Sequence, residues 1–190
     1  MRYKKFEGDK LYFSPIDVND LEIFTDWMSD ETVIRGLGSS NKNLTEMSEK
    51  NYLEKIASNP NSHQFSIILK ANDKLIGTYS LHEIDFLNGF CLVGGFIGDI
   101  EDRNKGYGTE ALTMICDYAF NVLNIKNIVG QVYSFNKPSI KSYEKVGFKL
   151  AGTIIKNYFY RGNYHDEYYY QMSREDFYKD HKTFVKPLPE

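Results

Sequence analysis

Cysteine is scarce in this sequence: the two cysteines, Cys91 and Cys116, both lie in apolar stretches. A count of two excludes a disulfide-rich scaffold. We therefore expect reduced, buried thiols, as in proteins of a reducing compartment. Because neither cysteine has a histidine motif beside it, we do not expect either to carry an acyl group during catalysis.

Long apolar runs are also missing. No segment approaches the ~18 apolar residues that a membrane-spanning helix needs. The N-terminal stretch MRYKKFEGDKLYF has no apolar run long enough for a secretory signal. We therefore expect a cytoplasmic, soluble protein.

Positive charge is not in excess, since 23 Lys and Arg face 26 Asp and Glu for a net charge of -3. This balance argues against a nucleic acid partner, for which a basic patch would be expected. It suits a cationic small molecule or a basic peptide. No metal site is expected. What the chain does have is 190 residues that are 42% hydrophobic and 15% aromatic, enough for one domain with a sizeable core.

Apolar residues at helical spacing predict four helices, at residues 17–31, 44–58, 107–124 and 137–147. We expect Asp17 or Asn19 to cap the first helix. Its buried face should carry Val18, Leu21, Phe24 and Trp27. The second helix should bury a looser face made of Leu44, Met47, Tyr52 and Ile56.

Strand patterns occupy residues 11–16, 64–84, 89–100, 127–134, 153–160 and 164–172. The turn sequence ANDK divides the second stretch into a hairpin, and RGN joins the last two strands. The apolar stretch 89–100 should be a central strand buried on both faces. This order predicts a single α/β or α+β domain over residues 1–180, with a mixed, mostly antiparallel sheet and helices on both faces. The strand–helix–strand unit should be a right-handed crossover, and residues 181–190 should form an extended or mobile tail.

A phosphate-binding loop is predicted at RNKGYG, residues 103–108, which directly precedes a helix. Helix N-termini offer free N–H groups, and glycine lets a phosphate come close to the backbone. A Walker loop is excluded because Thr109 and Glu110 follow Gly108 where Lys and Ser/Thr are needed. A dinucleotide-binding loop is disfavoured because the following strand has no acidic residue for the ribose.

The third pattern is Arg-x-x-Gly-x-Gly, formed here by Arg103, Gly106 and Gly108 after a buried strand. Downstream, NKPSIKSYEKVGF is similar to an Asn-x-x-Ser-Ile-x-x-Tyr-x-x-x-Gly-Phe segment, and the chain closes with GNYHDEYYYQM. Together with the opening LYFSPIDVNDLEIFTDWMSDETVIRGLG, these segments resemble the GNAT superfamily of N-acetyltransferases. The likeness spans residues 11–172 and is strongest to the branch with ribosomal-protein and spermidine acetyltransferases.

The resemblance implies a sheet whose central parallel pair is splayed, with acetyl-CoA as co-substrate. It also implies direct transfer, in a ternary complex, of an acetyl group to a primary amine on a protein N-terminus, a polyamine or another small molecule. In such enzymes a tyrosine at the place of Tyr143 points at the coenzyme sulfur. The cofactor-binding residues expected here are Gly95, Phe96, Ile97, Arg103, Asn104, Lys105, Gly106, Tyr107, Gly108, Thr109, Asn136 and Ser139.

Several alternatives stay open. A non-catalytic acyl-CoA-binding module, acting as a sensor or partner-binding protein, would share the same fold. Asn136 would either bind the coenzyme or cap its own loop. The resembling enzymes often carry a glutamate where this chain has Leu92, so the base that deprotonates the amine is not assigned. His82, Glu83 and Asp85 are the candidates.

Acceptor choice should depend on the N-terminal helices, the loop GLGSSNKN and the closing hairpin. Asp26, Asp30 and Glu31 form an acidic group that would either meet a cationic acceptor or simply be a solvated helix end. The aromatic hairpin Tyr158–Tyr170 would either wall the acceptor cleft or pair two subunits in a homodimer.

Overall fold

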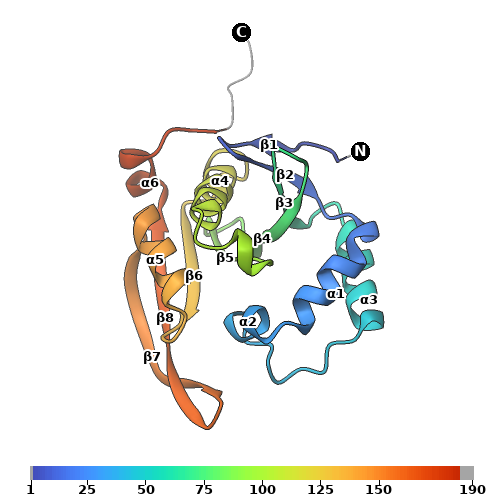
Figure 1. The fold of residues 1–190 in the computed structure, drawn as a ribbon. Coiled ribbons are helices and arrows are strands. Elements are labelled where there is room, and N and C mark those ends of the chain that lie inside the picture. Colours follow the sequence, from blue (N-terminus) through green and yellow to red (C-terminus); the bar gives the residue numbers. More distant parts are fainter. Residues whose placement is uncertain (1, 185–190) are drawn as a thin grey trace.

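The sheet has eight strands in the order β1-β2-β3-β4-β5-β6-β8-β7 (Figure 1). The structure is a computed structural model that describes residues 2–184. All neighbouring strands pair antiparallel except β5 and β6, which are parallel. The strands are β1 (Phe6–Glu7), β2 (Leu11–Pro15), β3 (His63–Leu69), β4 (Leu75–Asp85), β5 (Phe90–Ile97), β6 (Asn127–Tyr133), β7 (Lys149–Tyr160) and β8 (Asn163–Ser173).

The α-helices are α1 (Leu21–Ser29), α2 (Glu31–Ile34), α3 (Glu46–Ala57), α4 (Tyr107–Asn121), α5 (Lys137–Val146) and α6 (Arg174–Asp180). Helix α4 connects the two parallel strands, so the predicted strand–helix–strand unit is present. Helix α5 has the expected ends, with Asn136 at its N-cap, a proline in its first turn and Gly147 in a left-handed conformation just past its end.

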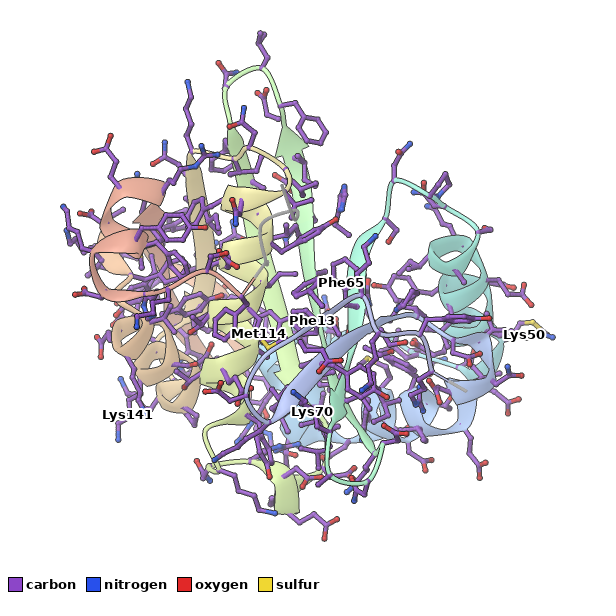
Figure 2. All side chains as sticks on the ribbon, turned by 90° about the horizontal axis from the view of Figure 1, so that it is seen from above. Phe13, Lys50, Phe65, Lys70, Met114 and Lys141 are labelled. Atoms are coloured by element: carbon purple, nitrogen blue, oxygen red, sulfur yellow. The ribbon has the colours of Figure 1, made fainter. Side chains whose placement is uncertain are left out.

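Helices cover both faces of the sheet, as the sequence predicts. Alternate residues of β2 point to opposite sides, so Phe13 joins one core and Tyr12 joins another. The larger core packs α4, α5 and α6 against the sheet, and the smaller one packs α1, α2 and α3. Phe13, Phe65 and Met114 lie in the interior, whereas Lys50, Lys70 and Lys141 project outward (Figure 2).

The first helix begins later than predicted. Asp17 caps a short 3-10 turn at Val18–Asp20, and α1 then starts at Leu21. Phe24 and Trp27 are buried as expected, but Val18 is exposed. The chain also forms a further short helix, α2, because Asp30 ends α1 and its side chain accepts a hydrogen bond from the backbone of Thr32.

The predicted buried face of the second helix is wrong in part, although Ile56 does pack against the smaller core. Met47 and Tyr52 are exposed, and α3 instead buries Glu49 and Leu53. The sequence could not show that an acidic residue of this helix, rather than its apolar neighbours, faces inward.

Strand β5 is fully buried only over Cys91–Val93, while Gly94–Ile97 is half-buried, so the expectation of burial on both faces holds for its first part alone.

No helix in residues 2–184 is long and apolar enough to span a membrane. After α6 the described chain stays attached to the domain, since Asp117 accepts hydrogen bonds from Thr183 and from the backbone of Phe184. The predicted extended tail otherwise falls on residues 185–190, which lie outside the described residues.

Candidate active site

The two parallel strands separate in the middle of the sheet, as expected. Their pairing runs only from Phe90–Asn127 to Val93–Gly130. Beyond Val93, β5 stays paired with β4, and beyond Gly130, β6 stays paired with β8. Each strand therefore presents an unpaired backbone edge to the gap, where an extended ligand with amide groups can form hydrogen bonds.

Tyr143 lies at the point where the strands separate. Its hydroxyl donates a hydrogen bond to the backbone oxygen of Val93, at 3.2 Å. Its ring covers Gly130 so closely that a Cβ there would lie within 2.2 Å of the ring. Burial raises the pKa of the Tyr143 hydroxyl well above its ordinary value, so the group stays protonated at neutral pH and remains a hydrogen-bond donor.

The predicted phosphate loop, residues 103–109, offers a row of free amides. None of the backbone N–H groups of residues 104–109 donates a hydrogen bond to another described residue, whereas Glu110 already bonds to Gly106. Asn104 and Gly106, just before the helix, adopt left-handed conformations, with φ of 61° and 87°. Such a row at a helix N-terminus is suited to bind an anion.

The two cations of this loop are held by the protein itself. The guanidinium of Arg103 donates to the backbone oxygen of Ile97 at 3.1 Å and to Thr32 at 3.0 Å. Lys105 lies 3.5 Å from the carboxylate of Asp102 and is half exposed. Arg103 therefore ties the end of β5 to α2 through hydrogen bonds from its guanidinium.

Asn136 caps its own helix: its side-chain oxygen accepts from the backbone N–H of Ser139 at 3.3 Å. Of the two roles left open by the sequence, capping is thus present in the structure. Thr109 and Ser142 are hydrogen-bonded at 3.2 Å and link the first turn of α4 to α5. This contact fixes the phosphate loop relative to Tyr143.

A cavity of about 520 Å³ lies between the N-terminal helices and the sheet, and we call it the central cavity. Helices α1 and α3 and the loop between α2 and α3 form one wall, and strands β3, β4, β5, β6 and β8 form the other. It is lined by Phe24, Met28, Gly36, Leu37, Ser39, Lys42, Leu44, Ser48, Glu49, Tyr52, Gln64, Thr78, Ser80, His82, Val93, Gly94, Gly95, Phe96, Gln131, Tyr133 and Glu167. The cavity thus reaches the same segment of β5 that Tyr143 contacts, and two reactants can meet there.

Among the three candidate bases, only His82 lines the central cavity. Its ring lies over Gly94, where a Cβ would be 3.5 Å from it. Partial burial lowers the pKa of His82, which keeps the imidazole neutral and able to accept a proton at pH 7. Asp85 is occupied by hydrogen bonds from Asn88, which lower its pKa.

The acidic group predicted at the end of the first helix is largely engaged within the protein. Asp30 accepts hydrogen bonds from Thr32, and Glu31 accepts one from the hydroxyl of Tyr160 at 2.7 Å. None of Asp26, Asp30 and Glu31 lines the central cavity. Leu92, which stands where the resembling enzymes often carry a glutamate, is buried.

The cysteines match their predicted state as buried free thiols. Burial raises the pKa of Cys91 to about 12 and that of Cys116 well above its ordinary value. Neither is therefore ionised at neutral pH, which disfavours a role as nucleophile.

Sequence reasoning missed two carboxylates of the central cavity, Glu49 and Glu167, and the glycine that Tyr143 covers. Glu49 comes from a helix face that looked polar, and Glu167 from an aromatic strand, so neither carried a motif. Gly130 has one indirect signal: glycine inside a strand often marks the close approach of another group.

The profile of the Acetyltransferase (GNAT) domain family matches residues 10–149. The chain belongs to the GNAT family of acetyltransferases. It is 31% identical over 180 residues to the SPbeta prophage-derived N-acetyltransferase YokL of Bacillus subtilis, covering 92% of this chain and 96% of that protein. This GNAT protein is therefore an acetyl-CoA-dependent N-acetyltransferase, since membership of the family implies acetyl-CoA as the co-substrate.

More distant relatives of this GNAT protein act on a polyamine. It is 27% identical over 106 residues to the spermidine N(1)-acetyltransferase of Vibrio cholerae. This match covers 56% of this chain and 61% of that protein. The structure of the Vibrio cholerae spermidine N-acetyltransferase in complex with CoA and spermine superimposes with a TM-score of 0.81, at 19% identity, over 90% of this chain and 99% of that one. At this identity the superposition supports the fold.

Proposed function

We propose that this GNAT protein transfers the acetyl group of acetyl-CoA directly to a primary amine within a ternary complex. The coenzyme would place its diphosphate on the free amides of residues 104–109 and its pantetheine along the open edge of β5, at Gly95–Ile97. The amine would reach the thioester from the central cavity. What carries this proposal is the arrangement around Val93: Tyr143 contacts it on one side, and the central cavity reaches it on the other.

The chemistry requires one bond to form and one to break. The amine nitrogen attacks the thioester carbonyl carbon, the C–N bond forms, and the C–S bond breaks. An acceptor amine with pKa near ~10.4 must lose its proton, and neutral His82, directly or through water, would take it. The leaving thiolate would take the proton of Tyr143, and the second proton that the nitrogen loses as the amide forms would restore it, so that CoA leaves as a thiol. Backbone N–H groups of β5 would stabilise the developing oxyanion.

Replacing Tyr143 by Phe tests this assignment. We expect turnover to fall by about 10²-fold or more, because the thiolate loses its donor, while coenzyme affinity changes little. Thiol release gives the turnover, and calorimetry with CoA gives the affinity. Unchanged turnover would remove the acid role of Tyr143. Tight CoA binding by the wild-type protein with no acceptor-dependent thiol release across an amine library would instead favour the non-catalytic acyl-CoA-binding module.

The homodimer suggested by the sequence also belongs to this proposal. Strand β7 is an edge strand whose outer side is unpaired. It exposes several apolar side chains, namely Leu150, Ile154, Ile155 and Phe159. Natural edge strands with such apolar surface are ordinarily covered. Pairing of two copies over β7 would cover it.

A further inference from the structure

Glu49 is a buried carboxylate that the fold itself does not use. The residue is 6% exposed, and its carboxylate makes no hydrogen bond or ion pair with another described residue. A capping box of Thr45 and Ser48 starts α3 and fixes the helix so that Glu49 and Leu53, one turn apart, face inward. The helix thus aims an unpaired acid into the central cavity.

Leaving such a group buried is unfavourable for stability. An ionised carboxylate without a partner loses hydration and gains nothing in return, and this desolvation raises the pKa of Glu49. Lys42 also lines the cavity but does not form an ion pair with Glu49. The other carboxylate of the cavity, Glu167, is already held by hydrogen bonds from Asn157 and Tyr169. Glu49 is therefore the acid left available for a cationic ligand.

We infer that Glu49 is a specificity residue that binds a second cationic group of the acceptor, one that stays protonated and is distinct from the amine that is acetylated. The inference rests on the proposed amine acetylation. The reacting amine must be neutral to attack, and a carboxylate beside it would favour its charged form. Glu49 therefore suits a group that stays charged. It lies on the helical wall of the central cavity, whereas the thioester site lies on β5.

The nearby lining supports a cation at this place. Tyr52, one turn along α3, lines the same cavity, and its hydroxyl donates to Gln64 at 2.8 Å. Phe24 and Phe96 add aromatic surface on either side of the cavity. Aromatic walls with one carboxylate are suited to hold an alkylammonium group, whose methylenes contact the rings while its charge meets the acid.

The test compares two acceptors of equal length, 1,4-diaminobutane and butylamine, with the wild-type protein and Glu49→Gln. In the wild-type protein we expect a lower KM for the diamine. In Glu49→Gln the KM for the diamine should rise about tenfold or more, with kcat little changed and the KM for butylamine nearly constant. Glu54→Gln, an equal change of charge on the exposed side of the same helix, is the matched control and should leave both KM values unchanged.

Thermal unfolding distinguishes this role from a structural one. Since Glu49 has no partner to lose, Glu49→Gln should unfold at the same temperature as the wild-type protein or higher, whereas a stabilising residue would show a lower Tm. A wild-type protein without preference for the diamine, or a preference that Glu49→Gln retains, overturns the inference. Failure of both amines to release thiol would count against the proposed function, and calorimetry with 1,4-diaminobutane alone would then decide the role of Glu49.

Discussion

At the scale of single residues, the site depends on groups whose surroundings change their chemistry. Burial keeps the hydroxyl of Tyr143 protonated, and it keeps His82 neutral. The two groups lie on the same short stretch of the sheet, because Tyr143 bonds to Val93 and His82 lies over Gly94. A donor and an acceptor of protons are thus held on adjacent residues of β5.

The pH dependence of kcat tests the role of His82. Because desolvation lowers its pKa below the ordinary ~6.5, His82 is neutral at pH 7 and gains a proton only in more acidic solution. We expect kcat to stay constant from about pH 8 down to about pH 6.5 and to fall at lower pH as His82 protonates. The kcat of His82→Asn should be lower than that of the wild-type protein and should not fall further at acidic pH. An identical pH profile in the variant would rule out His82 as the proton acceptor.

At the scale of elements, the decisive feature is how α4 begins. Left-handed conformations at Asn104 and Gly106 turn successive amides outward, and the helix then adds the free amides of its first turn. No atom lies within 4 Å of a Cβ placed on Gly106, so the structure gives no steric reason for a glycine there. The positive φ is the reason for a glycine that the structure shows, and a phosphate bound as proposed would add a second one, the need for close approach to the backbone.

Gly106→Val should therefore weaken CoA binding at least tenfold, because a β-branched residue resists the left-handed conformation and its side chain would enter the anion site. Calorimetry with CoA measures the effect. The matched control is Gly162→Val, at the tip of the β7–β8 hairpin, where φ is also positive and space is also open. This control should lose similar stability but keep CoA affinity. Normal affinity in Gly106→Val would refute the assignment of the loop.

At the scale of the whole molecule, two layers of helices cover opposite faces of the sheet, and in the proposed reaction each would serve a different reactant. The layer with α4 and α5 provides the phosphate loop and Tyr143, and the layer with α1 and α3 walls the central cavity. Contacts such as those of Arg103 with Thr32 and of Tyr160 with Glu31 connect the N-terminal helices to the sheet and its last hairpin. Figure 1 shows α1 and α3 across the central strands from this hairpin, with α2 close to the hairpin tip.

The homodimer prediction is also tested at this scale. Ile155 is 73% exposed on β7, and Ile155→Glu would place a charge in the proposed contact between two copies. We expect the wild-type protein to sediment as a dimer and Ile155→Glu as a monomer. Leu87→Glu, at another strongly exposed apolar position, should remain dimeric. A monomeric wild-type protein would contradict the prediction.

The sequence by itself determined the family, the order of the elements and the segments that carry them. These follow from local signals: glycines before α4, the Asn136–Phe148 segment and the alternation of the strands all act through neighbouring residues. The position of Tyr143 could be expected for the same reason, because it stands in register with those signals. Local signals were weaker at the N-terminal helices, where Asp30 starts an unpredicted helix and α3 turns an acid inward.

Only the tertiary structure decided which side chains share the central cavity and what each has left to bind. Glu49, His82 and Glu167 come from α3, β4 and β8, and no spacing along the chain relates them. Arg103 is a cation in the sequence, but the fold commits it to backbone oxygens. Whether a side chain is free to bind a ligand depends on its contacts with residues that are distant in sequence. The packing of the helices on the sheet decides these contacts.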